Sequence, residues 1–244
     1  MLSLGGDSLV FASNESCALV PASNIKLLTS ARALECWNDS LVRSLEVHLE
    51  RSSKRTHRLL LDSLLLDSLG IDHTEGLPGW RYVAWMNHRS DNRIADWLYR
   101  ELKTGDPNRS TRLFLDERGI PAPGLTIVDG SGLSARNRVA AITLARLLAN
   151  EARSPNSGVF VATLPRPGDP GTLARRGLGV GHRLHAKTGY IRASFALAGL
   201  LDIGPDTLAF AFLANNCPHG RSAYRMFTRL VVALDRDLHG TPTR

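Results

Sequence analysis

Two apolar runs near the end of the chain constrain its fold more than any other feature. Residues 193–201 and 208–214 are each long enough for a strand, and residues 202–206 between them contain the turn-forming pair Gly-Pro. Together they predict an antiparallel hairpin. Residues 222–238 have an amphipathic pattern that predicts a terminal helix packed on that hairpin.

Further helical patterns precede the hairpin. Residues 21–34 begin with a proline and a serine, which suit a helix N-terminus, and residues 92–103 follow the capping pair Ser90-Asp91. Residues 139–151 are also predicted to be helical. Helices at both ends of the chain around a late antiparallel hairpin predict an α+β fold.

The remaining segments give weaker predictions. Residues 8–12 form a short apolar run that predicts a strand, and residues 159–164 predict either a strand or a helix end. Residues 41–69 are rich in leucine and compatible with a helix, interrupted by a basic cluster at 51–58. We interpret that cluster as a solvated face.

Length and composition limit the number of domains and the classes of partner that the chain can have. A chain of 244 residues, 43% of them apolar, can bury a substantial core, and we expect one domain over residues 1–244. A net charge of +7 would suit an anionic partner such as a wall polymer, but no nucleic-acid-binding motif accompanies it, so no nucleic-acid role is expected. No apolar stretch is long enough for an integral membrane segment, and the first residues do not have the pattern of an export signal.

Cysteine and histidine spacings do not predict a metal site. Cys17, Cys36 and Cys217 are an odd number without metal-ligand spacing, so we interpret them as small buried thiols. His182 and His185 are close in sequence but have no third ligand nearby. We therefore expect no metal and no cofactor.

The first candidate motif is an S-x-x-K sequence at 23–26. On a helix, residues three apart share a face, so the Ser23 hydroxyl and the Lys26 amine can lie within hydrogen-bond reach. A lysine whose pKa is lowered by burial can accept the proton of such a serine and make it a nucleophile. The motif is short and carries little weight by itself.

Two tripeptides extend this set. Ser90-Asp91-Asn92 can serve as a simple helix cap, or it can supply a proton-relay hydroxyl from Ser90 and a substrate-binding amide from Asn92. Lys187-Thr188-Gly189 directly precedes the predicted hairpin. On an edge strand its glycine would let a substrate backbone approach, while the threonine and lysine would hold a carboxylate.

The three motifs occur in the order found in serine acyl transferases of the β-lactamase and penicillin-binding type. Their lysine positions are occupied by two of the four lysines in the chain. Longer segments around the motifs decide which family of these enzymes the chain resembles. They are residues 21–34, 90–102, 129–139, 164–176 and 186–199. With the phrases DGSGLS, LP followed by GTL, and AKTG followed by LAG, the chain resembles the D-alanyl-D-alanine carboxypeptidase/endopeptidase family, the class C low-molecular-mass penicillin-binding proteins.

The resemblance implies a β-lactamase/transpeptidase-like fold, an antiparallel sheet flanked by helices. It implies that Ser23 is the acylated nucleophile, that Lys26 is its base, and that the backbone N–H groups of Ser23 and Tyr190 form the oxyanion hole. The other implied site residues are catalytic Ser90, Asn92 and Lys187, and substrate-binding Thr188, Gly189 and Tyr190. The implied partners are peptidoglycan stem peptides and β-lactams, which would acylate the enzyme outside the cytoplasmic membrane.

The chain also departs from the family pattern. The two extra domains that family members carry between the first and second motifs are missing, position 190 is tyrosine where serine or threonine is usual, and position 135 is alanine where arginine is common. Ser131 or Ser134 followed by Asn137 could imitate the second motif, but we prefer Ser90 because it opens the stretch SDNRIADWL.

Two alternatives stay open, and the departures favour the first of them. One is an impaired relative that binds wall peptides or a partner without turnover. The other is a β-lactamase or esterase on the same fold, although no motif places a glutamate to activate a deacylating water.

Overall fold

The computed structural model describes most of the chain. The described residues are 1–6, 8–36, 40–41, 44–45, 47–48, 79–102, 105–174, 179–218 and 220–239. The basic cluster at 51–58 and most of the leucine-rich stretch at 41–69 lie outside them.

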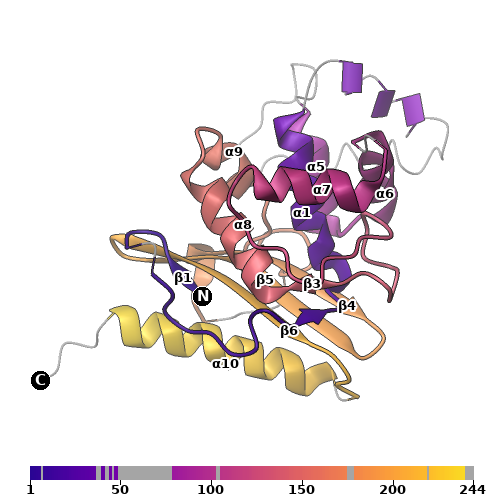
Figure 1. Cartoon of the computed structure of the whole chain (residues 1–244). Helices are drawn as coiled ribbons and strands as arrows, with labels where there is room; N and C mark the ends of the chain where they lie inside the picture. The colour runs from indigo at the N-terminus through magenta and orange to yellow at the C-terminus, as the bar shows by residue number, and fades with distance from the viewer. Residues whose placement is uncertain are drawn as a thin grey trace, which may run out of the picture.

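A four-stranded antiparallel sheet forms the centre of the molecule (Figure 1). Its strand order is β1 (Leu2–Ser3), β6 (Asp206–Ala214), β5 (Ser194–Ile203) and β4 (Leu184–Ile191). The predicted hairpin is confirmed as β5 and β6, which remain paired up to Ile203 and Asp206. β4 pairs with β5 only, so its other side is an edge of the sheet.

The predicted strand at residues 8–12 is wrong. Leu2 and Ser3 occupy the edge of β6 instead, and Leu9 forms a single bridge to Leu2. The run also exchanges backbone hydrogen bonds with residues 1–3, but Leu9 and Phe11 are each 50% exposed, so it adds little to the core. A separate two-stranded sheet pairs β2 (Ala18–Leu19) with β3 (Val139–Ala140).

The helices in the described part of the chain are η1 (Ala22–Asn24), α1 (Ile25–Glu35), α5 (Trp80–Arg89), α6 (Asn92–Glu101), α7 (Pro107–Asp116), α8 (Ala141–Arg153), α9 (Ser157–Ala162), η2 (Gly181–Arg183) and α10 (Gly220–His239). The predicted helices are confirmed at 21–34, as η1 and α1, and at 222–238, as α10. The helix predicted at 92–103 is confirmed as α6, which ends at Glu101, and residue 103 lies outside the described residues. The predicted helix at 139–151 begins two residues late, because β3 takes its first two positions, and 159–164 is part of α9 and the turn after it.

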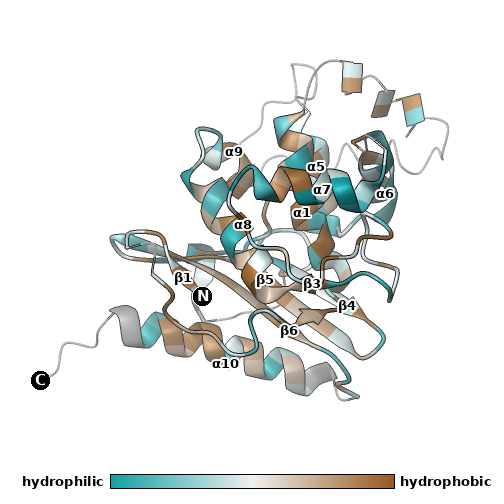
Figure 2. Ribbon diagram, viewed as in Figure 1, coloured by the Kyte–Doolittle hydropathy of each residue, from teal (hydrophilic) through white to brown (hydrophobic). Residues whose placement is uncertain are grey.

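The helices cover the two faces of the sheet (Figure 1). α10 packs on one face, where Phe227 and Val231 join a core with Phe195 and Phe210 of the strands. α1 and α8 pack on the opposite face, and α5 and α6 form a further cluster against α1. Along α10, apolar and polar residues alternate as expected for a helix with one buried face (Figure 2). The predicted α+β class is confirmed.

The interpretation of the cysteines as buried thiols is wrong for two of the three. Cys17 and Cys36 are exposed and Cys217 is half-buried, and none of the three is in a disulfide bond. Cys36 lies just after the end of α1, where the helix leaves the core.

Candidate active site

The first motif lies at the start of α1. Ser23 is in η1, and Lys26 follows in the first turn of α1. Ala22, just before the serine, has a φ of +48°, a left-handed conformation that is uncommon for non-glycine residues and is found often at functional sites. Ser23 is partly exposed and Lys26 is fully buried. Lys26 Nζ donates to Ser23 Oγ over 3.2 Å, so the structure brings these two predicted residues together.

Two further oxygens complete the surroundings of Lys26. Nζ donates to Asn92 Oδ1 at 2.8 Å and to the backbone oxygen of Ser131 at 2.5 Å. Both of these oxygens can only accept hydrogen bonds, so they match two N–H groups whether Lys26 is charged or neutral. When Lys26 is neutral, its lone pair is left for the third partner, the hydroxyl of Ser23.

Burial lowers the pKa of Lys26, which favours the neutral amine that can act as a base. Loss of hydration lowers its pKa from 10.5 to about 8, although the carboxylates of Asp96, Asp129 and Asp91 act in the opposite direction. An amine with a pKa of about 8 is half neutral at pH 8 and about one-tenth neutral at pH 7, far more than an ordinary lysine. The neutral form can take the proton from a neighbouring hydroxyl, which the charged form cannot do.

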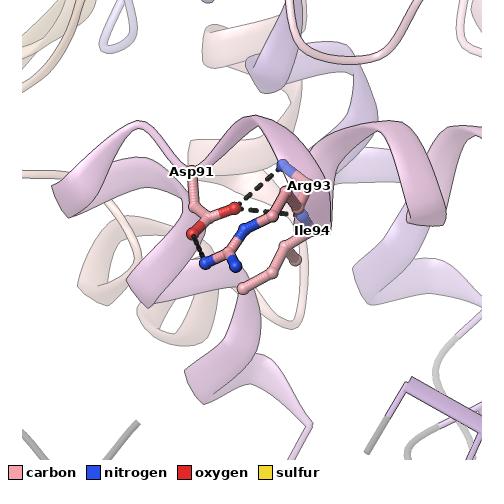
Figure 3. A network of polar contacts seen from close by, with 3 residues as sticks. All are labelled: Asp91, Arg93 and Ile94. Carbon is pink, nitrogen blue, oxygen red and sulfur yellow. Dashed lines mark hydrogen bonds and ion pairs between the residues drawn. The ribbon is translucent and has the colours of Figure 1, made fainter. Parts of the chain in front are cut away.

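The second motif lies at the junction of α5 and α6. Ser90 ends α5 in a left-handed conformation with φ 55° and ψ 41°, and the chain turns sharply there. Asp91 then caps α6, because its side chain accepts hydrogen bonds from the backbone N–H groups of Arg93 and Ile94 at 2.8 and 3.2 Å (Figure 3). The next residue, Asn92, begins the helix and points its amide to the site.

The third motif brings the sheet to the same place. Lys187 is on the edge strand β4 and is fully buried. Its Nζ donates to Ser90 Oγ at 3.1 Å and to the backbone oxygen of Thr188 at 3.0 Å. Lys26 thus contacts Ser23 and Asn92, and Lys187 contacts Ser90. Through these hydrogen bonds the three motifs meet at one place.

Gly189 explains how β4 comes so close to the first motif. A Cβ atom at this position would lie 2.8 Å from the backbone oxygen of Pro21 and 3.3 Å from Cβ of Ala22. Any larger residue would push the strand away from η1. Of its neighbours, Thr188 is buried, whereas Tyr190 is 62% exposed.

A loop that follows α7 lies against the first motif. The sequence did not predict that the backbone of this loop contacts Lys26. Asp129 accepts hydrogen bonds from the backbone N–H groups of Gly132 and Ser134, each at 2.7 Å, and from Nδ2 of Asn137 at 2.8 Å. Gly132 has a φ of +86°, and a Cβ atom there would lie 1.9 Å from the backbone oxygen of Ala22. The loop is thus built against the turn that carries Ser23.

Asp96 is a site residue that the sequence analysis missed. Its Oδ1 accepts from the backbone N–H of Ser131 at 2.9 Å, and the backbone oxygen of that same residue accepts from Lys26. Burial raises the pKa of the Asp96 carboxyl. Its position four residues after Asn92, on the same face of α6, was the available signal.

The motif Lys-Thr-Gly occurs twice in the sequence, at 187–189 and also at 103–105. Lys103 and Thr104 lie outside the described residues. The contact of Lys187 with Ser90 is what associates the later copy with the site.

Within the described residues, no group of three or more His, Cys, Asp or Glu side chains is arranged to hold a metal ion. None of the helices in this part of the chain combines the length and the apolar character needed to cross a membrane.

Solved structures share this fold. The chain aligns with penicillin binding protein 4 of Haemophilus influenzae with a TM-score of 0.54 and 26% identity, over 62% of this chain and 40% of that one. It also aligns with a Streptomyces K15 DD-transpeptidase with a TM-score of 0.62 over 96% of this chain and 95% of that one, although at 10% identity this likeness concerns the fold alone. These likenesses identify the fold as that of the penicillin-binding and transpeptidase-type proteins.

The chain belongs to the D-Ala-D-Ala carboxypeptidase 3 (S13) family, whose model matches residues 73–237. This confirms the family expected from the motifs. Among curated proteins, it is 35% identical over 182 residues to Carboxypeptidase DacB of Mycolicibacterium smegmatis, which covers 67% of this chain and 40% of that protein. The chain thus spans about two fifths of the length of this relative.

The family match contains the second and third motifs but begins after the first. The association of Ser23 and Lys26 with the site therefore rests on their contacts, in particular on the hydrogen bond from Lys26 to Asn92.

Proposed function

We propose that this chain is a serine-type D-Ala-D-Ala carboxypeptidase/endopeptidase that acts through an acyl-enzyme on Ser23. The single observation that carries the proposal is the contact of the buried Lys26 amine, with its pKa of about 8, with the Ser23 hydroxyl at 3.2 Å. A serine beside an amine of this kind has the means to become a nucleophile at neutral pH.

In the proposed reaction, Ser23 Oγ attacks the carbonyl carbon of the scissile peptide bond and Lys26 takes the hydroxyl proton. The backbone N–H groups of Ser23 and Tyr190 would stabilise the negative charge on the carbonyl oxygen. The C–N bond then breaks, and the leaving nitrogen receives a proton through Ser90, whose hydroxyl contacts Lys187. Water finally attacks the ester, which releases the acid and restores the Ser23 hydroxyl.

The remaining site residues have binding roles in this proposal. Asn92 would donate its amide N–H to the substrate while its oxygen stays on Lys26. Gly189 lets the edge of β4 lie close to the serine, so that a substrate can extend along this edge. Thr188 and Lys187 would hold the carboxylate at the end of the peptide.

The substrate class and the location are also proposals. Family membership and the curated carboxypeptidase relatives favour peptidoglycan stem peptides, and the complex of Haemophilus influenzae penicillin binding protein 4 with a β-lactam favours acylation by such compounds. A peptidoglycan substrate would place the protein outside the cytoplasmic membrane.

The decisive experiment is covalent labelling with a fluorescent penicillin, followed by intact-mass and peptide mass spectrometry. We expect one adduct, on Ser23, and its loss in Ser23→Ala. Ser154→Ala, which removes a hydroxyl at the end of α8, should label like the parent protein and serves as the matched control. Labelling should be much slower in Lys187→Ala, because Ser90 loses its partner.

Three results would contradict the proposal. Stoichiometric labelling that survives Ser23→Ala would show that another residue is the nucleophile. Absence of any adduct on folded protein would favour the alternative, a relative that binds wall peptides without turnover. Rapid hydrolysis of nitrocefin would instead indicate a β-lactamase.

A further inference from the structure

Tyr190 is an exposed aromatic residue directly beside the candidate active site. It follows Gly189 on β4, and Gly189 is the residue that lies against Pro21 and Ala22, just before Ser23. Of its side chain, 62% is exposed, although it is one of the larger apolar side chains of the described residues. An exposed ring at such a position can contact a bound substrate.

One face of the Tyr190 ring packs against other aromatic side chains. It packs on Phe195, its partner across the β4–β5 pair, with ring centroids 4.8 Å apart and an angle of 31° between the planes. Phe195 in turn packs edge-on against Tyr224 of α10 at 5.6 Å. Tyr224 Oη also donates to the backbone oxygen of Gly189 at 3.2 Å, which ties this strand to the helix.

This support makes Tyr190 a fixed surface. Phe195 is 4% exposed and Phe227, which packs against Tyr224 at 6.4 Å, is 1% exposed, so the array is anchored in the core between α10 and the sheet. A ring already immobilised by its neighbours loses little conformational entropy when a ligand packs on it. Its solvent-facing side is therefore suited to an apolar or planar group.

The charges of the site indicate which part of the substrate meets this ring. In the proposed reaction, the leaving residue carries the terminal carboxylate and its nitrogen is protonated through Ser90. Lys187 is the cation that contacts Ser90, and it lies on the same strand as Tyr190, three residues earlier. Residues three apart on a strand point to opposite faces, so Lys187 faces Ser90 while Tyr190 faces the α10 side of the same strand edge. A leaving residue bound along the edge at residues 187–190 would reach Lys187 with its carboxylate and the ring with its side chain.

We propose that Tyr190 is a specificity-determining residue that favours a D-amino acid with a large apolar or aromatic side chain as the leaving residue. This inference rests on the function proposed above and adds a preference at one subsite. The chemistry is unchanged: the bond between the penultimate D-Ala and the leaving residue breaks, and that residue departs as the free amino acid with a protonated amine.

The test compares two peptides that differ only in the leaving residue. Diacetyl-L-Lys-D-Ala-D-Ala and diacetyl-L-Lys-D-Ala-D-Phe give the same acyl-enzyme, so the ratio of their kcat/KM values reports on the leaving residue alone. Release of D-Ala or D-Phe is measured for the 244-residue chain and for Tyr190→Ser and Tyr190→Phe. Fluorescent penicillin labelling of Ser23 is measured on the same preparations.

We expect the parent protein to prefer the D-Phe peptide. Since an aromatic pair of this kind changes an equilibrium or rate by about three- to tenfold, Tyr190→Ser should lower the ratio of D-Phe to D-Ala turnover by this amount. Tyr190→Phe, which keeps the ring and removes the hydroxyl, should leave the ratio unchanged. Because the side chain is mostly exposed, neither variant should unfold the protein.

The outcomes separate the two proposals. If penicillin labels Ser23 but the ratio is the same in the parent protein and in Tyr190→Ser, the inference about Tyr190 is wrong and the proposed function stands. Failure to release either amino acid from a protein that penicillin labels also overturns the inference, because no leaving residue is then accepted. If penicillin does not label Ser23 at all, the proposed function itself fails.

Discussion

At the scale of single residues, the site depends on how Lys26 is surrounded. It is fully buried, and its Nζ contacts one hydroxyl and two oxygens that only accept hydrogen bonds. Hydration is lost on burial, so the charged form is destabilised and the pKa falls to about 8. The same residue can thus hold Asn92 in place in both charge states and act as a base in only one.

The first prediction concerns pH. Below a pH of about 8 Lys26 is mostly protonated and has no lone pair for the Ser23 proton, so the rate constant for acylation by penicillin should rise with pH from 6, reach half of its maximum near pH 8 and level off above about pH 9. The measurement is the labelling rate across this range. A rate that does not change from pH 6 to pH 9 would show that Lys26 is not the base.

Lys26→Arg tests the same point with a side chain that stays charged. A guanidinium keeps its proton in this range, so the variant should be labelled at least about a hundredfold more slowly at pH 8. Circular dichroism of the variant controls for loss of folding.

At the scale of elements, helix starts position two of the three motifs. Ser23 precedes the first turn of α1, and Asn92 is the first residue of α6 after the Asp91 cap. A capping side chain satisfies N–H groups that have no partner within the helix, and so it fixes the direction in which the helix begins. The orientation of Asn92 towards Lys26 is therefore a property of the helix start.

The second prediction compares two caps of the same type. Asp91 accepts from Arg93 and Ile94 at the start of α6, and Asp106 accepts from Asn108 and Arg109 at the start of α7. Asp91→Ala and Asp106→Ala should each lower the free energy of unfolding by about 1 kcal/mol, measured by urea denaturation.

Their effects on the site should differ. Asp91→Ala should also slow penicillin labelling, because Asn92 loses its fixed position, whereas Asp106→Ala should label like the parent protein. Equal labelling rates in the two variants would mean that the cap contributes only to stability.

The third prediction concerns the loop against η1. Gly132→Ala places a Cβ atom where the backbone oxygen of Ala22 lies, at a residue with positive φ. The loop or the serine turn must move, so we expect a loss of stability of more than about 1 kcal/mol together with slower labelling. Gly158→Ala, where an added Cβ meets no atom within 4 Å, is the control and should change neither value.

At the scale of the whole molecule, the site is formed between two layers. Ser23, Lys26, Ser90 and Asn92 come from the helical side, and Lys187 comes from the edge of the sheet. α10 covers the opposite face of the sheet, where the core that it shares with β5 and β6 supports the strands (Figure 1). Its contribution should therefore appear mainly in stability.

The fourth prediction tests this support. Phe227 on α10 is 1% exposed and stacks on Phe212 at 5.6 Å. Phe227→Ala should lower the free energy of unfolding by about 3–5 kcal/mol, seen as a fall in the thermal unfolding midpoint. Met226→Ala, at the neighbouring and 48% exposed position, should change it by less than about 0.5 kcal/mol. Similar effects of the two changes would contradict the assigned packing of α10.

Much of the fold was predictable because its patterns are local. The β5–β6 hairpin and α10 follow from apolar runs around a Gly-Pro turn and from helical periodicity, and α6 follows from its capping residue. α5 and α7 were not predicted from the sequence. The apolar run at 8–12 failed as a strand because pairing depends on which segment reaches the edge of β6, and Leu2 and Ser3 occupy it.

In the candidate site, too, local patterns were predictable and long-range contacts were not. The sequence by itself determined the family and the order of the motifs, and it supplied the candidate site residues, since these are encoded in short segments. Only the tertiary structure decided that Lys26 meets Asn92 and Ser131, which lie 66 and 105 positions away, and that Lys187 meets Ser90 across 97 positions. It also associated the Lys-Thr-Gly at 187–189 with the site, through the contact of Lys187 with Ser90. The physical reason is that hydrogen bonds and burial depend on distances in space, which local patterns along the chain do not contain.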